Sequence, residues 1–468
     1  MLFNSLVFLA FASFFFLFWH RVNTQRARRL AFIVTMSSVF YGWWNWGFLV
    51  LIFATGLVDF VAAQLIETHP RHKKKLLVFS LSMNLGTLGV FKYSGFLAIN
   101  LNWLLSPFSL HVPVAEFVLP IGISFYTFQS MSYAIDVYRG HCKATRDALH
   151  FYSSLLLFPQ LVAGPILRAG EILPQLETVP STTEQQRWDG MKLIAQGYFK
   201  KMVIADNLAP AVTTAFGAPH IAHSGLFWWV IITMFAFQIY CDFSGYTDIA
   251  RGLAKWMGYE FRLNFDRPYA ASSLREFWER WHISLSTWFR DYVYIPLGGS
   301  RKGTFRSHLN MWITMLLSGL WHGANWKFIA WGALHASYLS AEKLTSWPAR
   351  IARFPGGGAL ATLLVLVQVW IAWVFFRAES ASQAVEILAM MFRLPPGEHP
   401  SLRPAVYFLA LAIAYELAMW SLARTGARES RHERREASMW LEPAGVALLV
   451  VASIFLRGPG HAFIYFQF

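Results

Sequence analysis

A histidine inside an apolar region is the residue in this chain best suited to carry chemistry. His322 lies in a short polar stretch, residues 321–326, between two apolar runs, Leu309–Leu320 and Phe328–Leu339. Each run is about twelve residues, or about 18 Å of helix, which is too short to cross a hydrocarbon core of about 30 Å. Two half-length helices meeting at a polar corner would place His322 deep in a membrane, where irregular backbone is tolerated only inside protein or beside a wet cavity. An ionisable group at that depth indicates a functional site, and a neutral imidazole there could act as a general base.

The same spacing has a structural interpretation that stays open at this point. His322 could instead be a core histidine that bonds a backbone carbonyl and links two helices. A second histidine, His282, falls on one helical face with Trp278, Trp281, Leu285 and Phe289. Such a histidine is more often packed among aromatic side chains than catalytic.

The composition predicts the elements that must position these residues. Of the 468 residues, 56% are hydrophobic and only 14% charged, against about 25% charged in a typical soluble protein. Apolar runs of membrane-spanning length recur throughout, which predicts an all-α polytopic membrane protein. The net charge of +14 does not point to nucleic acid. The basic residues cluster between apolar runs, where they indicate which loops lie on the cytoplasmic side of the membrane. The only cysteines, Cys142 and Cys241, are far apart, so we expect neither a disulfide framework nor a metal site.

The charged loops indicate on which side of the membrane the apolar runs begin and end. The first run, Leu2–Trp19, is followed by a basic cluster, which predicts an outside N-terminus and a cytoplasmic first loop. Residues 152–166 contain two prolines and a glycine, so a broken or re-entrant helix is expected there. Within Leu119–Val137, a polar stripe of Gln129, Ser132, Tyr133 and Asp136 should face the interior of the helix bundle.

The stretch from Arg251 to Arg306 is rich in arginine and lysine and is expected on the cytoplasmic side. It could bind the phosphates of an anionic substrate, since arginine matches phosphate geometry, or it could merely orient the loop. The candidate phosphate-binding residues are Arg267, Arg275, Arg280, Arg290, Arg301 and Lys302.

Several motifs together resemble the membrane-bound O-acyltransferase (MBOAT) family, most closely its bacterial branch containing the alginate O-acetyltransferase membrane subunit. The resemblance runs through most of the chain and is specific. The matching stretches are Phe158–Pro165, Tyr240–Asp248, Leu263–Tyr269, Phe277–Gly299, Leu320–Gly323 and the terminal Phe463–Phe468.

This resemblance implies a fold and two catalytic residues. The fold would be one MBOAT domain over residues 1–468, with a ring of about 10–12 transmembrane helices and re-entrant helices around a funnel and tunnel. Its catalytic core would cover about 116–345, followed by C-terminal helices in about 359–468. His322 matches the family's essential histidine, and His282 fills the family's second polar position.

The resemblance also implies an activity and partners. We expect acetyl transfer from cytoplasmic acetyl-CoA, as a substrate and with no cofactor, across a bacterial inner membrane for O-acetylation of an extracellular polysaccharide of the alginate or cellulose type. Expected partners are a periplasmic SGNH-hydrolase-like protein with a Ser-His-Asp site, a polysaccharide synthase or secretion complex, and membrane lipids. The loop Pro107–Glu116 and the tail Phe463–Phe468 are candidate outward contacts.

Other functions stay open on sequence grounds. Peptidoglycan or teichoic-acid O-acylation uses similar motifs. A polysaccharide or lipid transporter, or a scaffold without catalysis, would also place polar stripes among apolar helices. Turnover of acetyl-CoA that depends on the histidines would separate an enzyme from the last two.

Overall fold

The computed structural model describes residues 1–115, 117–218, 224–393, 402–425 and 433–464, and every regular element within these ranges is helical. The chain divides into two compact units. Unit 1 comprises Met1–Gly190 and Ala250–Arg262, and unit 2 comprises Met191–Ile249 and Leu263–Phe468. The chain therefore leaves unit 1, returns to it briefly and leaves it again. Nothing in these boundaries tests the predicted extent of a single domain or of its catalytic core.

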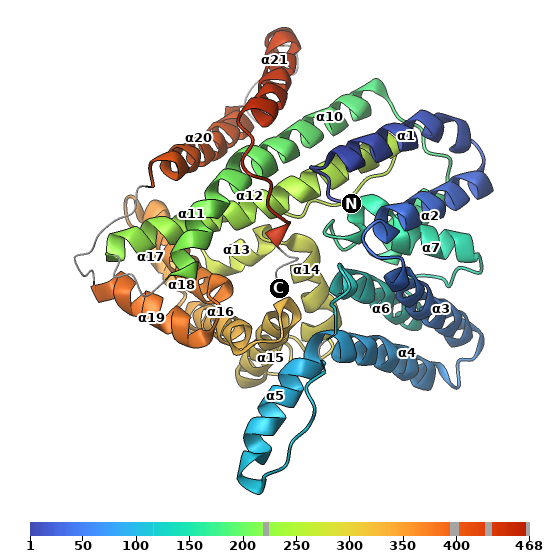
Figure 1. Cartoon of the computed structure of the whole chain (residues 1–468), viewed down its shortest axis with the longest axis horizontal. Helices are drawn as coiled ribbons and strands as arrows, with labels where there is room; N and C mark the ends of the chain where they lie inside the picture. Colours follow the sequence, from blue (N-terminus) through green and yellow to red (C-terminus); the bar gives the residue numbers. More distant parts are fainter. Residues whose placement is uncertain (116, 219–223, 394–401, 426–432, 465–468) are drawn as a thin grey trace. The chain divides into compact units, whose positions relative to one another are not determined.

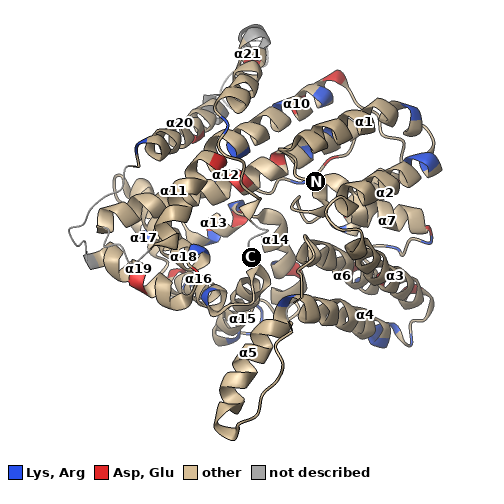
Figure 2. Cartoon of the chain, in the orientation of Figure 1, with Lys and Arg blue, Asp and Glu red and all other residues tan. Residues whose placement is uncertain are grey.

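The prediction of an all-α protein that crosses the membrane several times is confirmed. Among the residues that the structure describes, five helical segments are long and apolar enough to span a membrane: Gly47–Thr68, Lys73–Phe108, Gly225–Met257, Gly357–Arg377 and Arg403–Leu422. Figure 2 shows helix bodies that are mostly uncharged, with basic residues at the adjoining ends of α3 and α4, where Arg71 and Lys73 lie. The larger number of about 10–12 spans, and their ring, stay predictions.

Unit 1 is built on helices from the first part of the chain (Figure 1). They are α1 (Leu6–Val22), α2 (Arg26–Gly42), α3 (Gly47–Thr68), α4 (Lys73–Leu88), the π-helix η1 (Gly89–Tyr93), α5 (Ser94–Leu105), the 3₁₀-helix η2 (Ser106–Phe108), α6 (Ile123–Arg139), α7 (Ala148–Leu156), α8 (Phe158–Leu161) and α9 (Ala169–Glu177). α3, α4 and α6 pack against one another. Between them the buried carboxylate of Asp59 accepts hydrogen bonds from Ser80, Asn84 and Ser130.

Two local predictions in unit 1 are confirmed. The polar stripe on α6 is buried, and its bonds are structural: Gln129 donates to the carbonyl of Ser154 at 2.7 Å, and Tyr133 accepts from the backbone of Thr145 at 2.9 Å. The region around Pro159 is a broken helix, because α7 ends at Leu156 and the single turn of α8 follows. Both features consolidate the interior of this unit.

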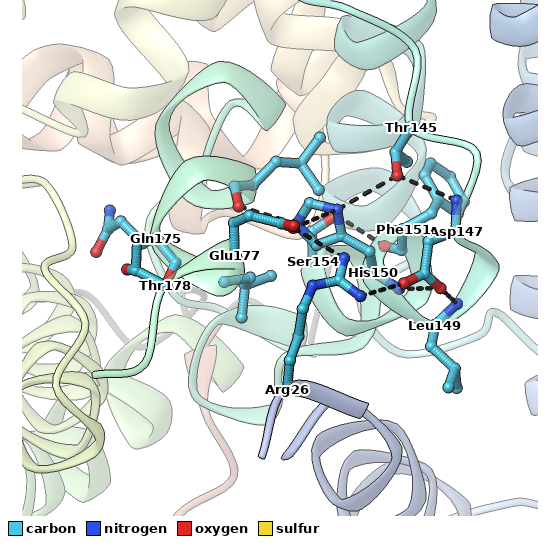
Figure 3. Close-up of polar contacts among 12 residues, drawn as sticks. Arg26, Thr145, Asp147, Leu149, His150, Phe151, Ser154, Gln175, Glu177 and Thr178 are labelled. Atoms are coloured by element: carbon cyan, nitrogen blue, oxygen red, sulfur yellow. Dashed lines mark hydrogen bonds and ion pairs between the residues drawn. The ribbon is translucent and has the colours of Figure 1, made fainter. Parts of the chain in front are cut away.

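Polar contacts around Arg26 join three helices of unit 1 (Figure 3). Arg26 at the start of α2 donates to Asp147 at 2.5 Å and to Glu177 at 2.8 Å. Asp147 also caps α7 by accepting from the backbone N–H of Leu149 at 2.9 Å. The hydrogen bond from Arg26 lowers the pKa of Glu177. One side chain therefore joins the N-termini of α2 and α7 to the C-terminus of α9.

Unit 2 holds the helices that carry both candidate catalytic histidines. They are the π-helix η3 (Phe199–Ala205), α11 (Asp206–Gly217), the 3₁₀-helix η4 (Pro268–Ala270), α13 (Leu274–Arg280), α14 (Ile283–Phe289), the π-helix η5 (Arg290–Tyr294), α15 (Thr304–His322), α16 (Trp326–Thr345), α17 (Trp347–Ile351), α18 (Gly357–Arg377), α19 (Ala381–Arg393), α20 (Arg403–Thr425) and α21 (Glu433–Phe455). α10 (Glu184–Tyr198) and α12 (Gly225–Met257) contribute to both units.

The helices around His322 are longer than predicted. α15 has 19 residues and α16 has 20, so each is about 30 Å long at 1.5 Å per residue. The prediction of two half-length helices is wrong, because polar residues such as Arg306 and Lys343 continue the helical backbone beyond the apolar runs. The break itself is where the sequence predicts it, between His322 and Trp326.

Two residues near the C-terminus, Phe463 and Ile464, are buried in unit 2. Phe463 is 1% exposed, and its ring packs against Phe243 and Tyr246 of α12. The backbone N–H of Ile464 donates to the carboxylate of Asp242 at 2.7 Å. The prediction that Phe463 forms part of an outward contact surface is therefore wrong, since aromatic packing buries it. Residues 465–468 of that predicted surface, and Glu116 of the other, lie outside the described residues.

Candidate active site

His322 is the last residue of α15, and the residues after it are built to turn the chain. Gly323 is extended, and a Cβ at this position would lie 2.2 Å from the ring of Phe328. Asn325 then starts α16 by accepting the backbone N–H of Lys327 on its side chain at 3.0 Å. The Trp-His-Gly-Ala-Asn-Trp stretch is therefore a helix end, a tight corner and an N-cap in direct succession.

Two glycines bring the backbones of α15 and α16 into contact. A Cβ on Gly319 would lie 2.2 Å from the carbonyl oxygen of Phe328, and one on Gly332 would lie 2.5 Å from that of Met315. Small residues of this kind allow close helix packing inside membranes. The hairpin therefore holds His322 at a position determined by the backbone of two helices.

Aromatic rings surround the imidazole of His322, which is 6% exposed. Ring centres lie 5.0 Å away for Trp321 and Trp331, 5.1 Å for Phe376 and 6.5 Å for Phe328. Three of these residues come from the α15–α16 hairpin and one from α18. The imidazole of His322 is therefore packed among aromatic rings from three helices.

His282 occupies a strained turn between α13 and α14. Its backbone is left-handed, with φ of 42° and ψ of 54°, a conformation that costs a non-glycine residue about 1–3 kcal/mol. The prediction of one continuous helical face through Trp278, His282 and Phe289 is wrong, because this residue interrupts the helix. His282 nonetheless lies among aromatic rings, as that prediction required.

The turn at His282 is held by a segment distant in sequence. The backbone N–H of Ile283 donates to the carbonyl of Asn264, and that of Asp266 donates to the carbonyl of Arg280, both at 2.9 Å. The side-chain oxygen of Asn264 lies 3.2 Å from Nδ1 of His282. Two of the stretches singled out in the sequence, Leu263–Tyr269 and Phe277–Gly299, thus meet at this histidine.

The structure brings the two candidate histidines together around one indole. The ring of Trp321 lies 5.0 Å from His322 and 6.3 Å from His282. His282 lies outside the apolar helices that could cross a membrane, and burial lowers its pKa to about 3. Its imidazole is therefore neutral at physiological pH, with a nitrogen lone pair that can accept a proton or a hydrogen bond.

Most of the six candidate phosphate-binding residues already have polar partners. Arg275 binds Glu279, Arg280 binds Glu276 and Arg290 binds Asp291, at 2.7–3.0 Å; Arg267 lies 3.5 Å from Asp266. By contrast, Arg301 and Lys302 are exposed and have no acidic partner within the described ranges. The predicted basic stretch is also divided, because Arg251, Lys255 and Arg262 belong to unit 1.

A second polar site in unit 2 was not predicted from the sequence. Lys201 on η3 lies 2.8 Å from Asp206 and 2.6 Å from Asp242, and donates to the carbonyl of His461 at 3.0 Å. These groups line a small pocket, together with Gln238 and Arg377. The signal in the sequence was a lysine pair, Lys200 and Lys201, within an otherwise apolar stretch. The cluster anchors the C-terminal segment to α12.

Comparison with known proteins agrees with the motifs. The profile of the MBOAT, membrane-bound O-acyltransferase family, matches residues 144–380. A protein from Pseudomonas putida named probable alginate O-acetylase is 38% identical, with all of both chains covered. The peptidoglycan O-acetyltransferase of Helicobacter pylori is 34% identical over 77% of this chain and 73% of its own. The teichoic acid D-alanyltransferase of Bacillus subtilis is 28% identical over 48% of this chain and 59% of its own.

Proposed function

Because this chain belongs to the membrane-bound O-acyltransferase family and is an O-acetyltransferase, we propose that it moves acetyl groups from acetyl-CoA across a bacterial inner membrane to acetylate an extracellular polysaccharide. We propose an alginate-type polysaccharide, because the full-length relative from Pseudomonas putida is named for alginate. The observation that carries the catalytic assignment is the meeting of His322 and His282 around Trp321.

In the proposed reaction His322 is the general base. It takes the proton from the acceptor hydroxyl while the hydroxyl oxygen attacks the thioester carbonyl of acetyl-CoA. The C–S bond then breaks, and the CoA sulfur leaves and recovers a proton from the imidazolium. His282 orients the reacting groups through a ring nitrogen that can accept a proton or a hydrogen bond, which is the part for which a fixed, neutral imidazole is suited.

We place the CoA phosphates near Arg301 and Lys302. These side chains lie in the exposed turn directly before α15, the helix that ends at His322, and within the described ranges they have no carboxylate to compete with a phosphate. Arg267, Arg275, Arg280 and Arg290 complete the proposed basic surface, although each is close to an acidic side chain. Changing Arg301 and Lys302 to glutamate should raise the KM for acetyl-CoA and leave kcat nearly unchanged; an unchanged KM would remove this assignment.

We propose that a periplasmic partner passes the acetyl group to the polysaccharide. Each unit contains helices apolar and long enough to span a membrane, so neither is a separate soluble domain that could bind a long hydrated chain. A hydrolase-like protein with a Ser-His-Asp site would supply that binding and the acceptor hydroxyl. The exposed loop with Phe108 and Leu110 is the proposed contact.

The catalytic assignment is tested with His322→Ala and the isosteric His322→Gln in purified protein. Loss of a general base should lower the rate of acetyl transfer by about 10²–10⁴-fold. His308→Ala is the matched control, because His308 lies on the same helix and bonds Ser340; it should retain activity. A folded His322→Gln protein with near-normal transfer would refute the assignment.

The relay is tested in liposomes with acetyl-CoA on one side and alginate on the other. We expect acetylated alginate only when the periplasmic partner is added on the alginate side. Acetylation by this protein alone would refute the relay, and acetylation of peptidoglycan in place of alginate would refute the proposed acceptor. Cellulose and teichoic acid serve as further acceptors in the same assay.

A further inference from the structure

We infer that Asn264 is a positioning residue for the acetyl-transfer reaction, which holds His282 in one tautomer and in its left-handed turn. This inference rests on the proposed role of His282 beside His322. It concerns a residue that does not itself contact either reacting group in the proposed mechanism.

One atom of Asn264 meets three polar groups. Its side-chain oxygen Oδ1 lies 3.1 Å from the backbone nitrogen of Ser284, 2.9 Å from the hydroxyl of Ser284 and 3.2 Å from Nδ1 of His282. All three residues are buried, with Asn264 and Ser284 each 1% exposed and His282 fully buried. No solvent reaches this contact, so its hydrogen bonds are not exchanged for bonds to bulk water.

The backbone of Ser284 determines which way these hydrogen bonds run. An asparagine amide can be turned so that either its oxygen or its nitrogen faces a neighbour. The backbone N–H of Ser284 can only donate, so the oxygen of Asn264 must face it. The same oxygen can only accept, so Nδ1 of His282 must carry a proton and donate. In a neutral imidazole this leaves the nitrogen lone pair on Nε2.

Asn264 also stabilises the strained backbone that presents this imidazole. His282 begins α14 but makes no side-chain cap of its own. Asn264 supplies the missing cap from another segment by accepting the N–H of Ser284, and its backbone carbonyl accepts that of Ile283 at 2.9 Å. A histidine keeps a left-handed backbone conformation only where several surrounding contacts hold it there. The cap and the tautomer thus depend on the same side chain.

Few of the described groups near His282 could control its tautomer or its protonation in place of Asn264. Phe243, Phe265 and Trp321 are among the rings packed on it, and none of these three titrates near neutral pH. Among the charged or titratable groups on the neighbouring segments, Asp242 pairs with Lys201, Asp266 lies near Arg267 and Arg280 pairs with Glu276. His322 contacts the ring of Trp321, and burial lowers the pKa of His461.

The discriminating variant is Asn264→Asp. A carboxylate keeps the acceptor oxygen, and therefore the cap, but it adds a charge that the uncharged amide lacks. The introduced carboxylate and His282 together should take up a proton at a higher pH than His282 alone, because the carboxylate stabilises an imidazolium. The acid limb of the kcat/KM profile should therefore move up by about one pH unit or more. Asn264→Ala, which removes tautomer control, should lower kcat by at least about tenfold.

The experiment compares full pH profiles of acetyl transfer for the wild type, Asn264→Asp, Asn264→Ala and His282→Ala in the purified membrane protein. Ser286→Ala is the matched control, because Ser286 lies on the same helix and donates to the carbonyl of Trp281, away from Asn264. Its profile should match the wild type. Size-exclusion elution and thermal melting confirm that each variant is folded.

The outcomes separate this inference from the proposed function. A wild-type acid limb in Asn264→Asp, while His282→Ala loses activity, would overturn the positioning role alone. Full activity in His282→Ala would overturn the proposed role of His282 and this inference with it. An equal shift in Ser286→Ala would also overturn the inference, since the profile would then respond to any disturbance of α14. If Asn264→Ala does not fold, the Asn264→Asp profile still decides.

Discussion

Adding one methyl group at Gly332 should separate α15 from α16 and disable the site. A Cβ there would lie 2.5 Å from the carbonyl oxygen of Met315, with further backbone atoms of α15 at 3.1 and 3.3 Å. An ordinary contact begins near 3.4 Å, so the helices must part by about 0.9 Å, the difference between 3.4 and 2.5. These are backbone atoms, so no side-chain rotation can relieve the overlap.

The magnitude follows from that displacement. Overpacking of this kind costs about 1–3 kcal/mol, which exceeds the gain of about 1 kcal/mol from alanine's better helix propensity. The hairpin carries His322, and misplacing a catalytic group by about 1 Å costs on the order of 100-fold in rate. We therefore expect Gly332→Ala to have a lower melting temperature and about 100-fold slower acetyl transfer.

The assay measures acetyl transfer and thermal melting of the purified protein in detergent. Gly358→Ala is the matched control, because a Cβ at this exposed helical position meets nothing within 4 Å. It should be neutral or slightly stabilising, with normal activity. Wild-type melting and activity in Gly332→Ala, or equal damage in Gly358→Ala, would refute the reasoning.

Three further perturbations follow from other contacts. Arg26→Ala should lower thermal stability by at most about 1 kcal/mol near neutral pH. Because the pKa values of both its partners, Glu177 and Asp147, are lowered, this contribution is present above about pH 5. It should shrink as the pH falls below about 4 and Glu177 and then Asp147 take up protons, and a constant difference down to pH 3 would contradict it. Asp242→Asn leaves buried Lys201 with one fewer carboxylate and weakens the hold on the N–H of Ile464, so limited proteolysis should cut near the C-terminus faster than in wild type. Asn325→Ala removes an N-cap and should cost about 1 kcal/mol in a denaturation measurement; unchanged stability would exclude that role.

Patterns that depend on neighbouring residues were readable from the sequence. The apolar runs predict a multi-pass helical membrane protein, since burying apolar surface and pairing backbone groups in lipid leave helices as the local solution. The break at Gly323–Asn325 and the broken helix around Pro159 follow from the local chemistry of glycine, asparagine and proline. The motif around His322 was therefore sufficient to select this histidine as the candidate from the order of residues alone.

Contacts between distant segments were decided only by the tertiary structure. The amphipathic spacing around His282 predicts a continuous helix, yet hydrogen bonds accepted by Asn264, eighteen residues upstream, stabilise a left-handed turn that local propensity disfavours. Helix lengths around the corner exceed the apolar runs because polar residues beyond those runs, such as Arg306 and Lys343, remain helical. The tail Phe463–Phe468 was expected at the outer face from the order of the spans, but the ring of Phe463 packs against Phe243. Such contacts depend on which helix surfaces pack together in the folded protein. The periodicity of residues along the chain does not specify that packing.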